Sequence, residues 1–253
     1  MVIAMAYTET DRNLPTRHNP YLHQLVIEEL KGRTPGQVLD LPSGPGYLLR
    51  DLQKLGFGGV AGEIDENLHV FSDLDYRKVD MTSRFDFKDG AFDYVVSIEG
   101  VEHIENHFLF LREVRRVLRK GGRLMLTTPN VLTLDSRLRF FLSGFHRLAE
   151  KPIPLDSKNM YFEHINPIDF NQLYFACETA GLKVVELKTY RYRRGSMLLY
   201  YLFYPFIKRA IYYSCFRKEK DPARREANRQ LYKWLSSKEN LLGSHTILIA
   251  EAR

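Results

Sequence analysis

The sequence has only two cysteines, Cys177 and Cys215, among its 253 residues. Two cysteines are too few for a disulfide framework and show no metal-type spacing, so they favour a reducing, intracellular setting. A secretory signal is also lacking, because residues 2–6 are apolar without a preceding cation and residues 8–17 are polar. We therefore expect a cytoplasmic protein, with the inner membrane face as a peripheral location.

Long hydrophobic runs, internal repeats and low-complexity tracts are absent as well. The most apolar stretch, residues 197–207, has eleven residues broken by Pro205, whereas about 20 are needed to span a bilayer. With 44% apolar and 27% charged residues, the composition excludes a disordered or collagen-like chain. The length fits one large packed domain, which is our starting interpretation.

Charge is distributed unevenly along the chain. Residues 183–253 hold 16 lysines and arginines against 6 acids, a net charge of +10, and residues 1–182 have a net charge of −4. An acidic body with a basic C-terminal third predicts an anionic partner there, such as a phosphate-bearing substrate, RNA or a lipid surface. The alternative is a basic surface that only keeps the protein in solution and binds no partner. The arginines at 112, 115, 116 and 119 predict the solvated face of a helix.

Hydrophobic periodicity predicts alternating strands and helices. Short apolar runs bounded by turn residues predict strands, and apolar residues at helical spacing predict helices. The expected strands are 38–41, 59–64, 92–97, 123–128, 183–190 and 245–252, and the expected helices are 21–30, 47–55, 107–119 (ended by Gly121 and Gly122) and 167–180. This order implies βαβ units and a parallel sheet between two helical layers.

The segment VLDLPSGPG, residues 38–46, is a strand that runs into a glycine turn and then a helix. Such a turn lets a nucleoside approach the backbone at the switch point of an open sheet. A dinucleotide fingerprint requires a third glycine, but Leu49 stands there, and the Asp40 carboxylate would repel a pyrophosphate. Asp40 instead suits a ligand with a cationic amino-acid end. A nicotinamide enzyme or a plain structural turn is less favoured.

These residues resemble the class I S-adenosylmethionine-dependent methyltransferases, over about residues 37–130. The resemblance also rests on FKDGAFDYVVS, a following Glu-His, and REVRRVLRKGGRLMLTTPN. It implies a Rossmann-like α/β fold with a mostly parallel seven-stranded sheet and helices on both faces. It further implies that Glu63, with Asp65 as its competitor, binds the ribose hydroxyls, and that Asp80 and the Met81 main chain bind adenine. The expected cofactor-binding residues are Asp40, Pro42, Gly44, Gly46, Glu63, Asp80, Met81 and Ser97. Pro42 departs from the family, where glycine is commoner.

Acidic residues and a histidine follow the strand 92–97. If they begin a helical turn, Glu99, Glu102 and His103 share one face, and His164 could supply a fourth metal ligand. This pattern resembles the metal-dependent small-RNA 2′-O-methyltransferases and, more loosely, the ubiquinone-pathway O-methyltransferases. The resemblance implies a divalent ion, Mg²⁺ or Mn²⁺, that activates a substrate hydroxyl. Alternatively, His103 and Glu102 act as catalytic residues without metal, or the residues only fill the pocket.

The chain is expected to form one methyltransferase domain over residues 1–253. Its expected parts are an N-terminal helical cap (1–36), a cofactor-binding core (37–130), a substrate-side segment (131–190), an aromatic and basic helical insertion (191–242) and the last strand (243–253). The insertion could close the pocket as a lid, form a dimer contact, lie on an anionic membrane surface or, less favoured, bind nucleic acid.

We therefore expect an S-adenosylmethionine-dependent enzyme that methylates a hydroxyl of a small-molecule, glycan or lipid-linked acceptor. A non-catalytic methyltransferase-like module that docks through its basic C-terminal third is the main alternative, and an RNA 2′-O-methyltransferase is another. Neither the acceptor nor the oligomeric state follows from the sequence.

Overall fold

The computed structural model describes residues 19–147, 152 and 163–253. Residues 1–18 of the expected N-terminal cap, and residues 148–151 and 153–162 of the expected substrate-side segment, lie outside the described residues. The described strands are β1 (Gln37–Asp40), β2 (Gly58–Glu63), β3 (Asp75–Lys78), β4 (Phe92–Ile98), β5 (Leu118–Pro129), β6 (Leu182–Lys188) and β7 (His245–Ala252). The described α-helices are α1 (Pro20–Leu30), α2 (Tyr47–Gln53), α3 (His107–Val117), α4 (Leu134–Ser143), α5 (Phe170–Thr179), α6 (Met197–Tyr212), α7 (Pro222–Leu235) and α8 (Lys238–Leu242).

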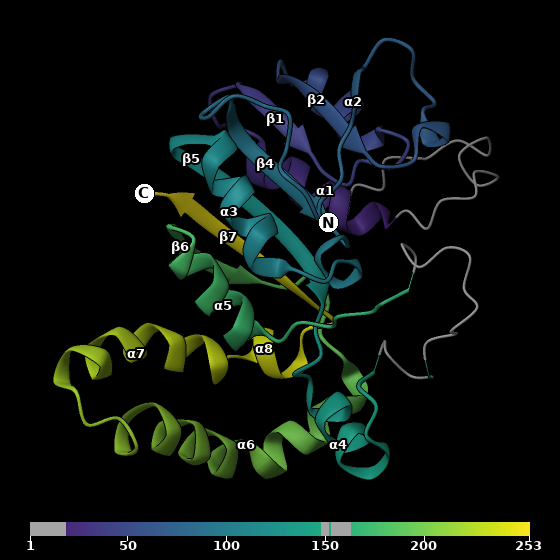
Figure 1. Ribbon diagram of the computed structural model, residues 1–253. Coiled ribbons are helices and arrows are strands. Elements are labelled where there is room, and N and C mark those ends of the chain that lie inside the picture. The colour runs from purple at the N-terminus through teal and green to yellow at the C-terminus, as the bar shows by residue number, and fades with distance from the viewer. Residues whose placement is uncertain (1–18, 148–151, 153–162) are drawn as a thin grey trace.

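One seven-stranded sheet runs through the molecule in the order β3-β2-β1-β4-β5-β7-β6 (Figure 1). Neighbouring strands from β3 to β5 are parallel, and β7 is antiparallel to both β5 and β6. The predicted mostly parallel seven-stranded sheet is therefore confirmed. The carboxyl ends of β1, β2, β4, β5 and β6 share one edge with the start of β7, and we call this edge the carboxyl edge.

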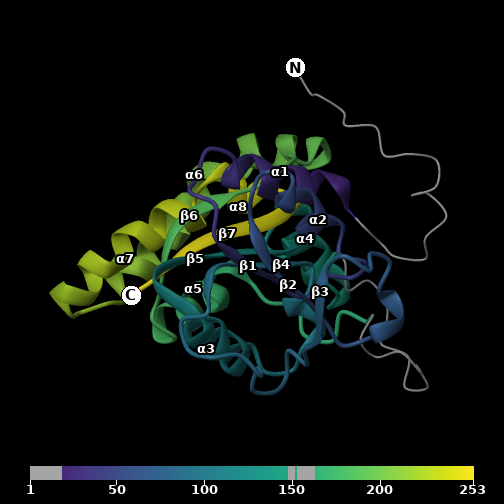
Figure 2. The ribbon, with the colours of Figure 1, turned by 90° about the horizontal axis from the view of Figure 1, so that it is seen from above.

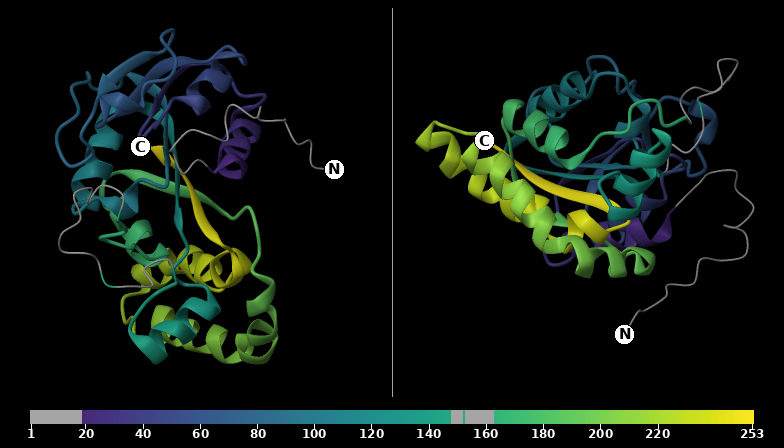
Figure 3. Two further views of the ribbon diagram at one scale, coloured as in Figure 1. Left: turned by 90° about the vertical axis from the view of Figure 1, so that its right-hand side faces the viewer. Right: turned by 90° about the horizontal axis from the view of Figure 1, so that it is seen from below.

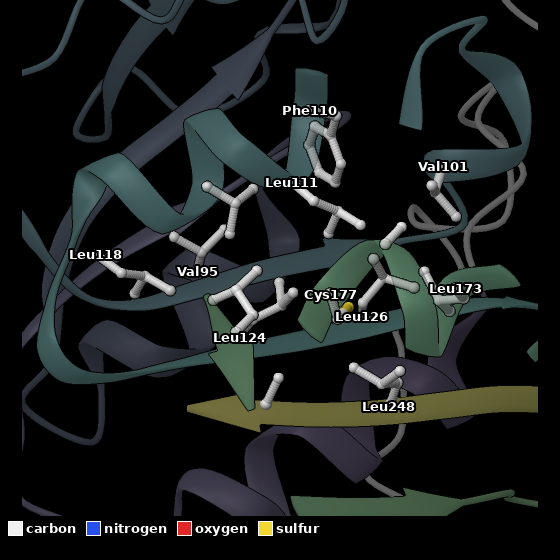
Figure 4. Packing of buried hydrophobic residues seen from close by; sticks show 14 of the residues in the cluster. Val95, Val101, Phe110, Leu111, Leu118, Leu124, Leu126, Leu173, Cys177 and Leu248 are labelled. Carbon is white, nitrogen blue, oxygen red and sulfur yellow. The ribbon is translucent and has the colours of Figure 1, made fainter. Parts of the chain in front are cut away.

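Helices cover both faces of the sheet, as the alternating pattern predicts (Figure 2). On one face, α3 and α5 bury Phe110, Leu111 and Leu173 against apolar residues of β4, β5 and β7 (Figure 4). On the other face, α1 and α2 bury Val26 and Leu49 in a second apolar cluster. These two buried layers fix the strands and hence the positions of the loops at the carboxyl edge.

Two local expectations were wrong, both at breaker residues. The helix α3 ends at Val117 instead of at the glycines, because Leu118 turns to an extended backbone and pairs with Phe92 of β4. Pro205 does not break the apolar stretch, since α6 continues through it. The neighbouring Tyr204 and Ile207 pack into an apolar cluster, and this packing offsets the hydrogen bond that proline cannot make. The sequence reading also missed β3, a four-residue edge strand of mostly exposed polar residues.

The row of arginines predicted on a solvated helix face is only partly formed: Arg119 lies in β5 instead of α3, and Arg116 is mostly buried. Arg116 donates hydrogen bonds to the carbonyl oxygens of Phe85 and Phe87, at 2.8 and 2.7 Å. It also binds the carboxylates of Glu113, at 2.6 Å, and Asp89, at 2.8 Å. The hydrogen bonds from Arg116 lower the pKa of Glu113. This side chain therefore fastens the loop that enters β4 to α3.

We expect Arg116→Ala to lower the free energy of unfolding by about 2 kcal/mol, because it leaves two part-buried carbonyl oxygens and the buried Glu113 carboxylate without this donor. Urea unfolding at neutral pH measures this change. Arg112→Ala, on the exposed face of the same helix, is the matched control and should change stability by less than about 0.5 kcal/mol. Equal effects of the two substitutions would contradict the fastening role.

Candidate active site

The glycine turn between β1 and α2 lies at the carboxyl edge. Gly44 and Gly46 both have left-handed backbones, with φ of 53° and 89°. A Cβ on Gly46 would lie 2.6 Å from side-chain atoms of Leu74 and Tyr76, whereas a Cβ on Gly44 would meet nothing within 4 Å. Gly46 is therefore required for close packing, and Gly44 leaves the outer side of the turn open to a ligand.

Two acids flank this turn from neighbouring parallel strands. Asp40, at the end of β1, is buried, and its Oδ2 atom has no hydrogen-bond partner among the described residues. Burial, together with the carboxylate of Glu63, raises the pKa of Asp40 well above its ordinary value. Glu63, at the end of β2, accepts hydrogen bonds from the backbone N–H groups of Gly44 and Ile64, at 2.9 and 2.8 Å. A cation beside Asp40 would supply the partner that the Oδ2 atom lacks.

The remaining expected cofactor residues lie on the loops next to the turn. Asp80, two residues beyond β3, is partly buried and accepts hydrogen bonds from the Thr82 N–H and hydroxyl, both at 2.7 Å. Met81 is buried, and Ser97 near the end of β4 is fully buried with no partner for its hydroxyl among the described residues. Pro42 packs against Gly100, where a Cβ would lie 2.4 Å from the proline ring.

A carboxylate and two imidazoles meet at the same edge. Glu102 and His103 belong to a short 3₁₀ turn after β4, Val101–His103, and His164 precedes α5. One potential ligand atom from each of Glu102, His103 and His164 lies within 4.8 Å of the others. Asn166 joins the two segments, because its backbone N–H donates to the Glu102 carbonyl oxygen at 3.1 Å. The structure thus brings together three of the four predicted metal ligands, and we call them the ligand cluster.

Burial controls the protonation of the ligand cluster. Burial, with the nearby Glu99 carboxylate, raises the pKa of Glu102. The Oε2 atom of Glu102 accepts a hydrogen bond from the Thr128 hydroxyl at 3.0 Å, and Oε1 has no partner among the described residues. Burial also lowers the pKa of His103, which favours a neutral imidazole. The His103 Nδ1 atom lies 2.9 Å from the Glu163 carbonyl oxygen, so Nδ1 carries the proton and Nε2 keeps a free lone pair.

The fourth predicted ligand, Glu99, lies outside the ligand cluster. Its backbone is left-handed, with φ of 52°, and it precedes the 3₁₀ turn, so the expected helical face shared with Glu102 does not form. The Glu99 carboxylate instead contacts His245 Nε2 at 3.2 Å and the Thr127 hydroxyl at 3.4 Å. The sequence reading missed His245, whose only signal was its position at the start of the last strand.

A family model described as a methyltransferase domain matches residues 13–187, more than half of the chain. This chain belongs to the class I S-adenosylmethionine-dependent methyltransferases. A probable S-adenosylmethionine-dependent methyltransferase of Mycobacterium tuberculosis is 30% identical over 129 residues, which cover 49% of this methyltransferase and 47% of the relative. The human mitochondrial ubiquinone biosynthesis O-methyltransferase is 28% identical over 142 residues, or 49% of this chain and 38% of the relative.

A solved structure shows the same fold. Phosphoethanolamine N-methyltransferase 2 of Haemonchus contortus, in complex with S-adenosyl-L-methionine, matches with a TM-score of 0.54 at 15% sequence identity. The match covers 91% of this methyltransferase and 52% of that chain. The methyltransferase spans about half the length of the M. tuberculosis relative. The family's cofactor is S-adenosylmethionine, and the open glycine turn with the unpartnered Oδ2 atom of Asp40 fits the ammonium group of its amino-acid end.

Proposed function

We propose that this methyltransferase transfers a methyl group from S-adenosylmethionine to an oxygen of its acceptor, with the help of a divalent metal. The observation that carries this proposal is the ligand cluster Glu102, His103 and His164 beside the glycine turn. Its acceptor would be a hydroxyl of a small molecule, a glycan or a lipid-linked compound. The similarity to a ubiquinone biosynthesis O-methyltransferase supports an oxygen acceptor.

The cofactor would be held by acids from three successive strand ends. Asp40 would face the cationic amino-acid end, Glu63 the ribose hydroxyls and Asp80 the adenine, beside Met81. When bound, S-adenosylmethionine supplies an electrophilic methyl group on a positively charged sulfur. Glu63 already accepts the Gly44 N–H, so the same carboxylate sets the shape of the turn. Gly44 adds no side chain that would block the ligand.

The ligand cluster fits a divalent ion by its chemistry. One carboxylate and two imidazoles suit Mn²⁺, Fe²⁺ or Zn²⁺, and abundant Mg²⁺ also binds such sites when oxygen ligands complete the shell. A bound ion supplies a Lewis acid that lowers the pKa of a substrate hydroxyl. The contact with Glu163 orients the His103 ring and leaves Nε2 for the ion. The unpartnered Oε1 atom of Glu102 is the matching oxygen donor.

The hydrogen bond from His103 to the Glu163 carbonyl oxygen also supports a mechanism without metal. With Nδ1 protonated against the Glu163 carbonyl, His103 Nε2 can accept a proton from an acceptor hydroxyl. The lowered pKa of His103 keeps this atom unprotonated at neutral pH. The two mechanisms differ in one measurable respect, the effect of a chelator.

A transfer assay with radiolabelled S-adenosylmethionine and a panel of catechols, sugars and lipid-linked sugars tests the proposal. We expect label in an ether-linked product, a fall of about 100-fold or more in rate with EDTA, and recovery with Mn²⁺ or Mg²⁺. Full activity in EDTA would leave only the His103 base. Label on nitrogen or carbon alone would contradict transfer to oxygen. Binding of S-adenosylhomocysteine without transfer to any acceptor would favour a non-catalytic module.

A further inference from the structure

The helical insertion is attached at the carboxyl edge of the sheet. The chain leaves the sheet after β6, forms the insertion and re-enters the sheet at β7. The end of β6 and the start of β7 lie at the same edge. Asn130, at the end of β5, donates its side-chain N–H to the carbonyl oxygens of Asn240 and Gly243, both at 2.9 Å. The helices α4 and α6 lie side by side below the sheet in Figures 1 and 3. The insertion is therefore fixed next to the candidate active site.

The inner side of α6 packs on the rest of the insertion. Tyr200, Tyr204 and Ile207 recur at helical spacing and belong to an apolar cluster. They pack with Leu134 of α4 and with Leu241 and Leu242 of α8, which are buried. This side accounts for the attachment of α6, and the opposite side of the helix faces away from the cluster.

The outer side of α6 is apolar as well, although it is exposed. Leu198, Leu202 and Phe206 follow one another at four-residue spacing, so they form one stripe, and they are 77%, 60% and 71% exposed. Tyr201 beside the stripe is exposed, and so are Phe141 and Leu142 at the end of α4. We call Leu198, Tyr201, Leu202 and Phe206, which share the outer side of α6, the docking face. Contiguous exposed apolar side chains of this size mark an interaction site.

The charged residues of the segment that carries the docking face all have the same sign. Residues 191–218 include seven lysines and arginines and no aspartate or glutamate. Lys208 and Arg209 follow the stripe in the last turns of α6 and are exposed. Arg191 and Arg194, before α6, and Arg217 and Lys218, after it, are exposed too. An apolar stripe between cations complements a surface that is negatively charged outside and apolar beneath.

We propose that the docking face inserts into the interfacial region of a lipid bilayer that contains anionic lipids. The axis of α6 lies in the membrane plane, its leucines and Phe206 reach the acyl boundary, and the tyrosines and cations lie at the headgroups. Among the described residues, no helix is long and apolar enough to cross a membrane. Docking would place the carboxyl edge beside the bilayer, where a lipid-linked acceptor could reach it. This link to the acceptor rests on the proposed function.

Charge argues against the other occupants of the docking face. A symmetric contact with a second copy would set the cations of residues 191–218 against the same cations, with no acid in that segment to pair them. Nucleic acid would match the cations and the rings of Tyr201 and Phe206, but it would leave the aliphatic side chains of Leu198 and Leu202 exposed to water. Anionic lipid satisfies both the charge and the aliphatic surface.

Co-sedimentation of the full chain with vesicles tests this proposal. We expect binding to phosphatidylcholine vesicles with about one third phosphatidylglycerol, weak binding to phosphatidylcholine alone, and weaker binding at about 1 M salt. The double variant Lys208→Glu/Arg209→Glu should weaken binding at least about tenfold. The neutral variant Leu202→Gln/Phe206→Gln should weaken it by a similar factor without changing its salt dependence. Because the readout is binding, its failure is distinguishable from a failure of methyl transfer.

The matched control reverses two charges far from the docking face. Lys88 and Lys120 are exposed near the amino ends of β4 and β5, at the opposite edge of the sheet, and Lys88→Glu/Lys120→Glu should leave binding within about twofold. All variants should keep the thermal midpoint of the parent chain, because the changed side chains are exposed. No binding to anionic vesicles would overturn the proposal. So would a dimer in light scattering that the docking-face variants dissociate, which would assign the face to a second copy.

Discussion

Asp40→Asn is expected to weaken binding of S-adenosylhomocysteine, which carries the same amino-acid end as the cofactor, by about 100-fold. The reason is that the buried carboxyl is replaced by a neutral group of the same shape, and removal of one partner of a buried charge pair has effects of this size. Burial, together with the Glu63 carboxylate, raises the pKa of Asp40, so the charged form of this group is disfavoured in the empty protein. The substitution should therefore leave the thermal midpoint of the ligand-free chain unchanged or slightly higher. Isothermal titration calorimetry and thermal unfolding measure the two effects separately.

Asp86→Asn is the control for this experiment, because Asp86 is exposed and outside the glycine turn. It should bind the ligand as the parent chain does. The ammonium group of the ligand beside Asp40 should lower the raised pKa of this carboxyl, so binding should release protons at a pH near that pKa, which is visible as a dependence of the binding heat on the buffer. Binding by Asp40→Asn that equals that of the parent would remove Asp40 from the cofactor site.

Glu102→Gln is expected to lower the affinity for Mn²⁺ by about 100-fold or more and to remove the metal-stimulated activity. The amide retains the volume of the carboxylate but has no negative charge to hold the ion. Substitutions of residues that only orient a metal ligand already lower metal affinity by roughly 10- to 100-fold. His164→Ala should have a similar effect on affinity, since its imidazole comes from a different segment of the chain. Electron paramagnetic resonance of free Mn²⁺ during a titration measures the affinity directly.

Glu105→Gln provides the matched control, since Glu105 is exposed two residues beyond the 3₁₀ turn. It should bind Mn²⁺ like the parent chain. The thermal midpoint of Glu102→Gln should not fall, because burial already raises the pKa of Glu102 and disfavours its charged form. Undiminished Mn²⁺ binding by both Glu102→Gln and His164→Ala would contradict a metal site here and favour the His103 base.

The parts of the fold that could be predicted from the sequence depend on short-range patterns. β7 was predicted at its observed bounds. A short apolar run with turn residues at both ends fits few secondary structures other than a strand. Errors occurred where packing overrode a local preference. α6 contains Pro205 because its inner side is buried against α4 and α8, and β3 forms from polar residues because the neighbouring edge of β2 supplies its hydrogen bonds. Arg116 became a fastening residue because a distant loop brings carbonyl groups to it.

By itself, the sequence determined the strand and helix alternation, the glycine turn at Gly44 and Gly46, and the acids that follow the strands, since all of these depend on residues close together in the chain. Only the tertiary structure decided which of the expected metal ligands meet. His164 reaches Glu102 and His103 across about sixty residues, whereas Glu99 is drawn to His245, which the antiparallel strand β7 returns to the same edge. The physical reason is that spacing along a chain fixes side-chain direction only within one regular element, and the left-handed backbone at Glu99 ended that element before the 3₁₀ turn began.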